Sequence, residues 1–226
     1  MRAAVIVFPG SNRDGDVARA LRRAGATVEK TWHADRELPA GTDLVVLPGG
    51  FSYGDYLRCG AIAARAAIMD AVRAHAAGGG LVLGICNGFQ ILCESGLLPG
   101  ILMRNAELRF VCRRQTVRVE RADTAFSRGY TKGQVIDVCV AHGEGNYAAD
   151  QATIDRLEGD GLVAFRYCNA EGELTAEANC NGSINFIAGI YSPQRNVLGL
   201  MPHPENLVDP LVGGTDGEGM FRSLAA

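Results

Sequence analysis

The chain has 226 residues, of which 47% are hydrophobic and 21% are charged, and its formal net charge is −3. This length and composition are typical of a protein with a large buried core, and we expect a single domain over residues 1–226. The small net charge gives no reason to expect nucleic acid or an anionic membrane as a partner. No apolar run approaches the roughly 20 residues that cross a bilayer.

Short apolar segments alternate with helical patterns through the first half of the chain. This alternation favours right-handed βαβ units, and hence an α/β fold with a largely parallel central sheet flanked by helices. In such sheets, functional sites lie beyond the carboxyl ends of the strands. The expected strands cover residues 3–8, 27–31, 44–47 and 81–84, and the expected helices cover residues 13–24 and 61–77.

The second half of the chain has shorter β-like segments, which could form an antiparallel edge or an insertion beside the parallel sheet. Seven arginines and only three acids lie between Arg104 and Arg128, which is consistent with a solvated strand face or with a docking surface for an acidic partner. A further apolar strand begins at Val197. The other expected strands cover residues 107–113, 116–120, 135–140 and 162–167.

Seven cysteines are spread along the chain, and no two have the C-x-x-C spacing of a zinc ribbon. We therefore expect no metal site. The first apolar stretch is too short for a signal peptide. Thiols in this number fit a reducing compartment, so we expect the protein to be cytoplasmic.

The segment Gly84-Ile85-Cys86-Asn87-Gly88 joins a predicted strand to a helical pattern. A sharp strand-to-helix turn needs small neighbours, which the two glycines supply, and it should expose the central side chain. The positive end of a helix stabilises a thiolate, which is the reactive form of cysteine. We therefore predict that Cys86 is a nucleophile.

A histidine and a carboxylate follow the late strand in the segment His203-Pro204-Glu205. In an extended segment, residues two apart point to the same face, and Pro204 favours an extended conformation. A carboxylate beside an imidazole fixes its tautomer and supports its positive charge. We predict that Cys86, His203 and Glu205 form a catalytic triad.

Attack on an amide creates an oxyanion, which needs backbone N–H donors. Asn87, the residue after the nucleophile, can supply one donor. Gly50, in the Pro48-Gly49-Gly50 turn after a strand, can supply the second, because glycine lets an amide turn toward a ligand. The loop that continues from Phe51 is expected to form a pocket wall, and His142, in a Gly-spaced polar segment, is expected to line the pocket.

These motifs together resemble the class I, triad-type glutamine amidotransferases, whose fold is flavodoxin-like. Further motifs narrow the resemblance to the family of glutaminase subunits of phosphoribosylformylglycinamidine synthase, an enzyme of purine biosynthesis. Two departures are Cys180, where this family is expected to have Pro, and Asn206, where Arg is expected. The narrowing motifs lie in residues 49–58, 105–113, 141–146 and 214–217.

The resemblance implies that the chain hydrolyses glutamine to glutamate and ammonia and passes the ammonia to a synthetase subunit. That subunit would use ATP and Mg to convert formylglycinamide ribonucleotide into formylglycinamidine ribonucleotide, and a small third subunit would complete the assembly. The chain itself has no G-x-x-x-x-G-K-[ST] loop, so no cofactor is expected in it. Gly49, Phe51 and Gln90 are the residues expected to contact glutamine together with His142.

Two other interpretations remain open from the sequence. One is a stand-alone cysteine hydrolase or stress-response protein, although such proteins often have His directly after the nucleophile, where this chain has Asn87. The other is an inactive module that serves as a scaffold, which an intact Cys86, His203 and Glu205 disfavour.

Overall fold

The computed structural model describes residues 1–225 and contains eleven strands and five α-helices in that range. The strands are β1 (Arg2–Val7), β2 (Thr27–Trp32), β3 (Leu44–Leu47), β4 (Leu81–Ile85), β5 (Ile101–Met103), β6 (Val111–Val119), β7 (Val135–His142), β8 (Asn146–Ala148), β9 (Val163–Tyr167), β10 (Ile187–Tyr191) and β11 (Val197–Leu200). The helices are α1 (Asp14–Arg23), α2 (Ile68–Ala77), α3 (Asn87–Glu94), α4 (Gln151–Gly159) and α5 (Glu218–Ala225).

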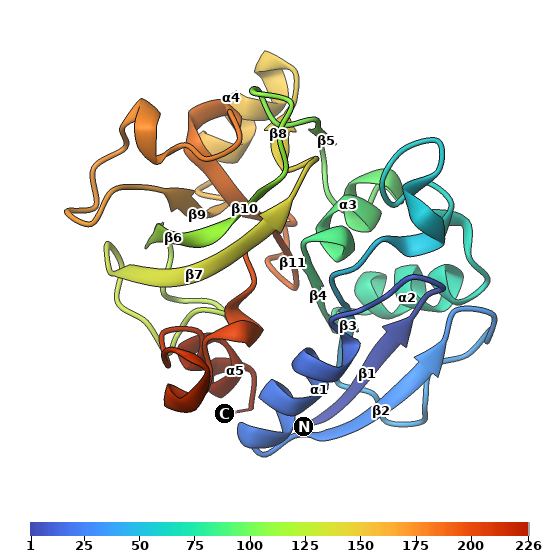
Figure 1. Ribbon diagram of the computed structural model, residues 1–226. Helices are drawn as coiled ribbons and strands as arrows, with labels where there is room; N and C mark the ends of the chain where they lie inside the picture. Colours follow the sequence, from blue (N-terminus) through green and yellow to red (C-terminus); the bar gives the residue numbers. More distant parts are fainter. Residues whose placement is uncertain (226) are drawn as a thin grey trace.

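Nine strands form one mixed sheet in the order β2-β1-β3-β4-β11-β10-β9-β6-β7. The five strands from β2 to β11 run parallel to one another, and the four from β10 to β7 are antiparallel to their neighbours (Figure 1). Strands β5 and β8 pair separately. The α/β fold with a parallel core and added antiparallel strands is therefore confirmed.

The central strands are covered on both faces. Every residue of β3, β10 and β11 is buried. Since successive side chains of a strand point to opposite faces, such a strand must have packing partners on both sides. On the outside, α5 at the end of the chain packs beside α1 (Figure 1).

Within residues 1–225, no helix has the length and apolar character that crossing a bilayer requires.

The prediction of one helix over residues 61–77 is wrong for the first part of that range. A short 3₁₀ turn covers Ala63–Arg65, the backbone is extended at Ala66, and α2 begins only at Ile68. An alanine-rich segment has high helix propensity throughout and therefore contains no local signal for the break. Arg73 fixes the break by donating a hydrogen bond of 2.8 Å to the carbonyl oxygen of Ala64.

The two strands expected over residues 107–113 and 116–120 are one strand, β6, which begins at Val111. Residues before it turn instead, with a positive φ of 56° at Leu108. The buried side chain of Asn105 fixes this turn, because its Nδ2 donates to the carbonyl oxygens of Arg109 and His142 at 2.7 and 2.9 Å. The contact with His142 joins residues 37 apart in sequence, so the β-like composition of the segment by itself does not predict the turn.

Candidate active site

Three loops converge at one edge of the parallel sheet. Strands β3, β4 and β11 are neighbours, and Gly49, Cys86 and His203 all follow their carboxyl ends. Parallel strands present the same end to the same edge, so three segments spaced along 150 residues of chain meet there. The expected convergence is confirmed by the sheet order.

Cys86 occupies the sharp turn between β4 and α3. Its φ of 52° is unusual for a residue with a side chain, and its amide donates 2.8 Å to the carbonyl oxygen of Leu200. A Cβ on Gly88 would collide with the carbonyl oxygen of Leu47, and a Cβ on Gly84 would lie 2.6 Å from the carbonyl oxygen of Gly88. Only glycine therefore fits on either side of this turn.

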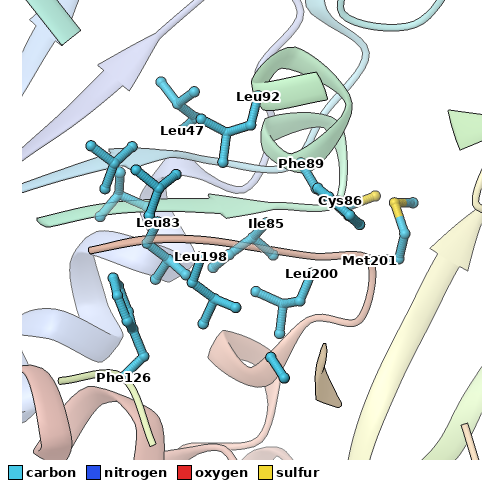
Figure 2. Packing of buried hydrophobic residues seen from close by; sticks show 14 of the residues in the cluster. Leu47, Leu83, Ile85, Cys86, Phe89, Leu92, Phe126, Leu198, Leu200 and Met201 are labelled. Atoms are coloured by element: carbon cyan, nitrogen blue, oxygen red, sulfur yellow. The ribbon is translucent and has the colours of Figure 1, made fainter. Parts of the chain in front are cut away.

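Cys86 follows β4 directly, and Figure 2 shows it beyond Ile85, at the start of the helix that carries Phe89 and Leu92. Cys86 is only 6% exposed, so the expectation of an exposed side chain is wrong. The turn does push the side chain out of the sheet, but the loops that cover the sheet edge enclose it.

His203 and Glu205 form a buried pair. Nδ1 of His203 lies 2.7 Å from Oε1 of Glu205, and the two residues are 2% and 0% exposed. The expected pairing is present, but its expected cause is wrong: Pro204–Asn206 is a 3₁₀ turn rather than an extended segment. Pro204 begins this turn, where its missing N–H costs no hydrogen bond.

The charges around His203 favour its protonated form. Burial opposes the imidazolium, but the carboxylate of Glu205 and the thiol of Cys86 outweigh it and hold the pKa of His203 well above its usual value. Nε2 of His203 has no hydrogen-bond partner within residues 1–225, and the thiol of Cys86 instead contacts the carbonyl oxygen of Ala141 at 3.8 Å. Catalytic hydrogen bonds are often long before substrate binds, so this geometry suits a resting nucleophile and base.

The amides of Gly50 and Asn87 are both available as donors. Within residues 1–225, neither N–H donates a hydrogen bond to another protein group. Asn87 begins α3, where the first amides of a helix lack partners in the helix. Gly49 lies against the histidine, since a Cβ there would be 2.7 Å from Cε1 of His203. Two backbone amides that lack partners within this range therefore lie at the sheet edge that carries Cys86 and His203.

A cavity of about 170 Å³ contains the thiol of Cys86. It is smaller than the pockets of roughly 300–1,000 Å³ that hold drug-sized ligands, so a single small molecule such as an amino acid suits it. Its lining comes from the loop after β3, from Cys86 and α3, from the residue before β6, and from the end of β7 with the loop after it. The lining residues are Gly50, Phe51, Asp55, Cys59, Cys86, Gln90, Phe110, Ala141, His142, Gly143 and Glu144.

Three of the expected substrate-contacting residues line this cavity. Phe51 is 46% exposed, and Gln90 is buried. The amide of Gln90 is already engaged, because its Oε1 accepts from Asn87 at 2.9 Å and its Nε2 donates to the carbonyl oxygen of Glu144 at 2.7 Å. Burial, and next the charge of His203, lower the pKa of His142 to about 3, so this ring is neutral. Gly49 is not among the lining residues.

Asp55, Cys59, Phe110 and Glu144 were not predicted individually as functional residues. Asp55, Phe110 and Glu144 lie in motifs on which the resemblance rests, whereas nothing local distinguishes Cys59 from the other cysteines. All four reach the cavity only because the loops around residues 51–59, 104–110 and 141–146 fold over the same edge of the sheet.

Three of the seven arginines between Arg104 and Arg128 bond to groups of the same region or of α5. Several are held within the chain: Arg118 pairs with Glu120 at 2.7 Å, Arg121 with Asp123 at 2.7 Å, and Arg128 donates to the carbonyl oxygen of Ser223. Arg104, Arg109, Arg113 and Arg114 are exposed, so both interpretations of the segment stay predictions.

Comparisons with known proteins identify the family. A family model for the CobB/CobQ-like glutamine amidotransferase domain matches residues 1–215. The phosphoribosylformylglycinamidine synthase subunit PurQ of Bradyrhizobium diazoefficiens is 67% identical over 226 residues, which are 100% of this chain and 97% of the relative. This chain belongs to the PurQ family of glutamine amidotransferases.

Two further PurQ relatives extend the comparison. The PurQ subunit of Rhodospirillum rubrum is 56% identical over 225 residues, covering 99% of this chain and 98% of the relative. The structure of PurLQS from Thermotoga maritima has a chain that is 41% identical, with a TM-score of 0.87, covering 99% of this chain and 96% of that one. The chain is thus a glutaminase subunit of phosphoribosylformylglycinamidine synthase, in purine biosynthesis.

Proposed function

We propose that Cys86, His203 and Glu205 form a triad that catalyses the glutaminase reaction. The main support for this proposal is the buried His203–Glu205 pair at the sheet edge where Cys86 occupies the strand-to-helix turn. The raised pKa of His203 favours transfer of the thiol proton to its imidazole, and the thiolate Sγ of Cys86 then forms a bond to the side-chain carbonyl carbon of glutamine. The C–N bond then breaks, and His203 delivers the proton to the leaving ammonia. Water hydrolyses the γ-glutamyl thioester to glutamate and restores the thiol.

The amides of Gly50 and Asn87 stabilise the oxyanion that forms when the thiol attacks. Neither amide donates another hydrogen bond within residues 1–225, Asn87 directly follows Cys86, and Gly50 lines the same cavity as Cys86. Glu205 keeps the proton of the imidazole on Nδ1 in the neutral form and stabilises the imidazolium once the thiol proton has transferred.

The ammonia passes to a synthetase subunit, which uses ATP and Mg to amidate formylglycinamide ribonucleotide, and a small third subunit completes the complex. The name of the PurLQS structure supports an assembly of this kind. Nothing in the triad chemistry needs a cofactor. We place the protein in the cytoplasm, because its seven cysteines are all free thiols, as a reducing compartment favours.

The experiment is a steady-state glutaminase assay of the chain alone and of the chain with both other subunits, ATP and the ribonucleotide. We expect low activity alone and a large increase in the complex, because free ammonia would otherwise be lost to solvent. Cys86→Ser should abolish glutamine use in the complex while leaving synthesis from added ammonia. Full activity of the chain alone would contradict coupling, and glutamine use by Cys86→Ser would contradict the nucleophile.

A further inference from the structure

The segment that precedes α5, drawn in red in Figure 1, has no part in the function proposed above. Its motif Gly214-Thr215-Asp216-Gly217 is one of those on which the family resemblance rests, and none of these four residues lines the cavity that contains Cys86. Their contacts lead instead to residues 203–207, here called the triad turn, which carry His203 and Glu205.

Gly217 lies directly against the triad turn. A Cβ at Gly217 would collide with the carbonyl oxygen of Pro204 and would lie 2.9 Å from that of Leu207. The amide of Gly217 donates a hydrogen bond of 2.8 Å to the same Leu207 oxygen, and the Pro204 oxygen accepts from the amide of Leu207 at 3.0 Å. Because Gly217 is buried and in close contact, it limits how far the turn can move toward α5.

Asp216 joins the same segment to the edge of the sheet. Strand β7 is the last strand in the sheet order. Oδ2 of Asp216 accepts a hydrogen bond of 2.8 Å from the amide of Asp137 in this strand. Two residues later in β7, the carbonyl oxygen of Cys139 accepts 2.8 Å from the amide of His203. The edge strand therefore holds both the segment before α5 and the triad turn.

Tyr130 holds the segment from the connection between β6 and β7. Its hydroxyl donates 2.9 Å to the carbonyl oxygen of Asp216 and accepts 3.0 Å from the amide of Met220, in the first turn of α5. The ring is only 8% exposed, and a Cβ at Gly219 would collide with it. The edge strand, its connection and α5 are thus joined into one unit that packs against the triad turn.

This unit bears on the placement of the imidazole relative to the thiol. His203 and Glu205 belong to one turn, so a shift of that turn moves both and preserves their 2.7 Å contact. Cys86 lies on a different element, between β4 and α3. A displaced turn therefore changes the separation of His203 from Cys86. Misplacing reacting groups by roughly 1 Å can cost about a hundredfold in rate.

We propose that Asp216 and Gly217 are positioning residues of the glutaminase reaction, which hold the triad turn at the distance from Cys86 that proton transfer needs. The inference rests on the glutaminase function proposed above. Since neither residue lines the cavity, their replacement should reduce turnover and leave glutamine binding unchanged.

The test measures kcat and KM for glutamine in the complete complex with Gly217→Ala, Asp216→Ala and Asp216→Asn. We expect kcat to fall roughly a hundredfold in Gly217→Ala and about tenfold in Asp216→Ala, with KM nearly unchanged. Asn keeps an oxygen that can accept from the amide of Asp137, so Asp216→Asn should restore most of kcat. The matched control is Asp150→Ala, because the exposed Asp150 also accepts 2.8 Å from a backbone amide, but at the start of α4.

An NMR pH titration of His203 in the isolated full chain adds a readout that a loss of stability or of subunit docking would not move. The titratable groups around its imidazole are Glu205, Cys86, Cys139 and His142. Burial lowers the pKa of His203, whereas Glu205 and Cys86 raise it. A looser turn should therefore shift the titration to lower pH in Asp216→Ala. Asp216→Asn, which lacks the same charge, should titrate as the wild type does.

An unchanged kcat in both Gly217→Ala and Asp216→Ala, or a similar loss in Asp150→Ala, would overturn the proposal. It would also be overturned by a loss confined to KM, by Asp216→Asn being as slow as Asp216→Ala, or by an unmoved His203 titration in Asp216→Ala. If Gly217→Ala does not fold, the Asp216 variants and the control decide. Failure of the wild-type complex to hydrolyse glutamine would instead refute the glutaminase function, whereas the titration tests positioning without turnover.

Discussion

Replacing Glu205 by glutamine tests the electrostatic part of the triad while keeping its shape. The amide of Gln has nearly the volume of the carboxylate and can still accept from Nδ1 of His203. In the wild type, the charge of Glu205 raises the pKa of His203 against the effect of burial. In Glu205→Gln, burial remains and the opposing carboxylate charge is gone, so we expect the pKa of His203 to fall and the ring to lose its positive charge near neutral pH.

The size of the effect follows from the contact. Nδ1 and Oε1 are 2.7 Å apart and Glu205 is 0% exposed, so solvent screens the pair little. A hydrogen bond to a charged group contributes about 1.5–3 kcal/mol, and each 1.36 kcal/mol is roughly a factor of ten in rate. A wrong tautomer or an unsupported imidazolium adds to this loss. We expect kcat for glutamine to fall by about 10²–10⁴.

The measurement combines glutaminase kinetics in the complex with an NMR pH titration of the four histidines. A group whose pKa is raised by folding stabilises the protein below its unfolded pKa, about 6.5 for His, and this contribution is lost as pH rises through the folded pKa. The difference in unfolding free energy between the wild type and Glu205→Gln should therefore be largest at mildly acid pH. Glu158→Gln, which removes a carboxylate 2.6 Å from Arg166 outside the site, is the control. An unchanged His203 titration with near-normal kcat would refute the reasoning.

Three further predictions concern the remaining parts of the site. A glutamine-like diazo-ketone should label Cys86 and no other cysteine, and peptide mapping that finds the label elsewhere would contradict the nucleophile. His203→Ala should reduce glutaminase kcat by roughly 10²–10⁴, whereas His75→Ala should leave it nearly unchanged; similar losses in both would mean that the base is misassigned. Gly49→Ala should reduce kcat, because the new Cβ would lie 2.7 Å from Cε1 of His203 and displace the imidazole. The control is Gly15→Ala, whose Cβ would have no atom within 4 Å, so its stability should be unchanged or slightly higher. Both variants are measured by kcat and by a thermal unfolding curve, and equal kcat values would refute the contact.

The parallel half of the fold and the sharp turn at Cys86 were predictable from the sequence because their signals are local. Strand β3 was predicted with its observed bounds, and β1, β2 and β4 within one or two residues. The sharp turn was recognisable because the backbone around Cys86 leaves no room for a Cβ at Gly84 or Gly88, so the turn itself requires glycine there. His203 and Glu205 were recognisable as a pair because they are two residues apart, although a 3₁₀ turn and not an extended segment joins them.

The antiparallel half and the cavity were decided by contacts that are remote in sequence. Strand β10, the helices α4 and α5 and the pair β5–β8 were not predicted, because their short apolar patterns gain stability only by packing on the sheet already formed. An isolated backbone bridge joins Cys139 of β7 to His203, two residues 64 apart in sequence. Asp55 and Glu144 are 89 residues apart in sequence. Both line the cavity of Cys86 only because their loops fold over the same edge of the sheet.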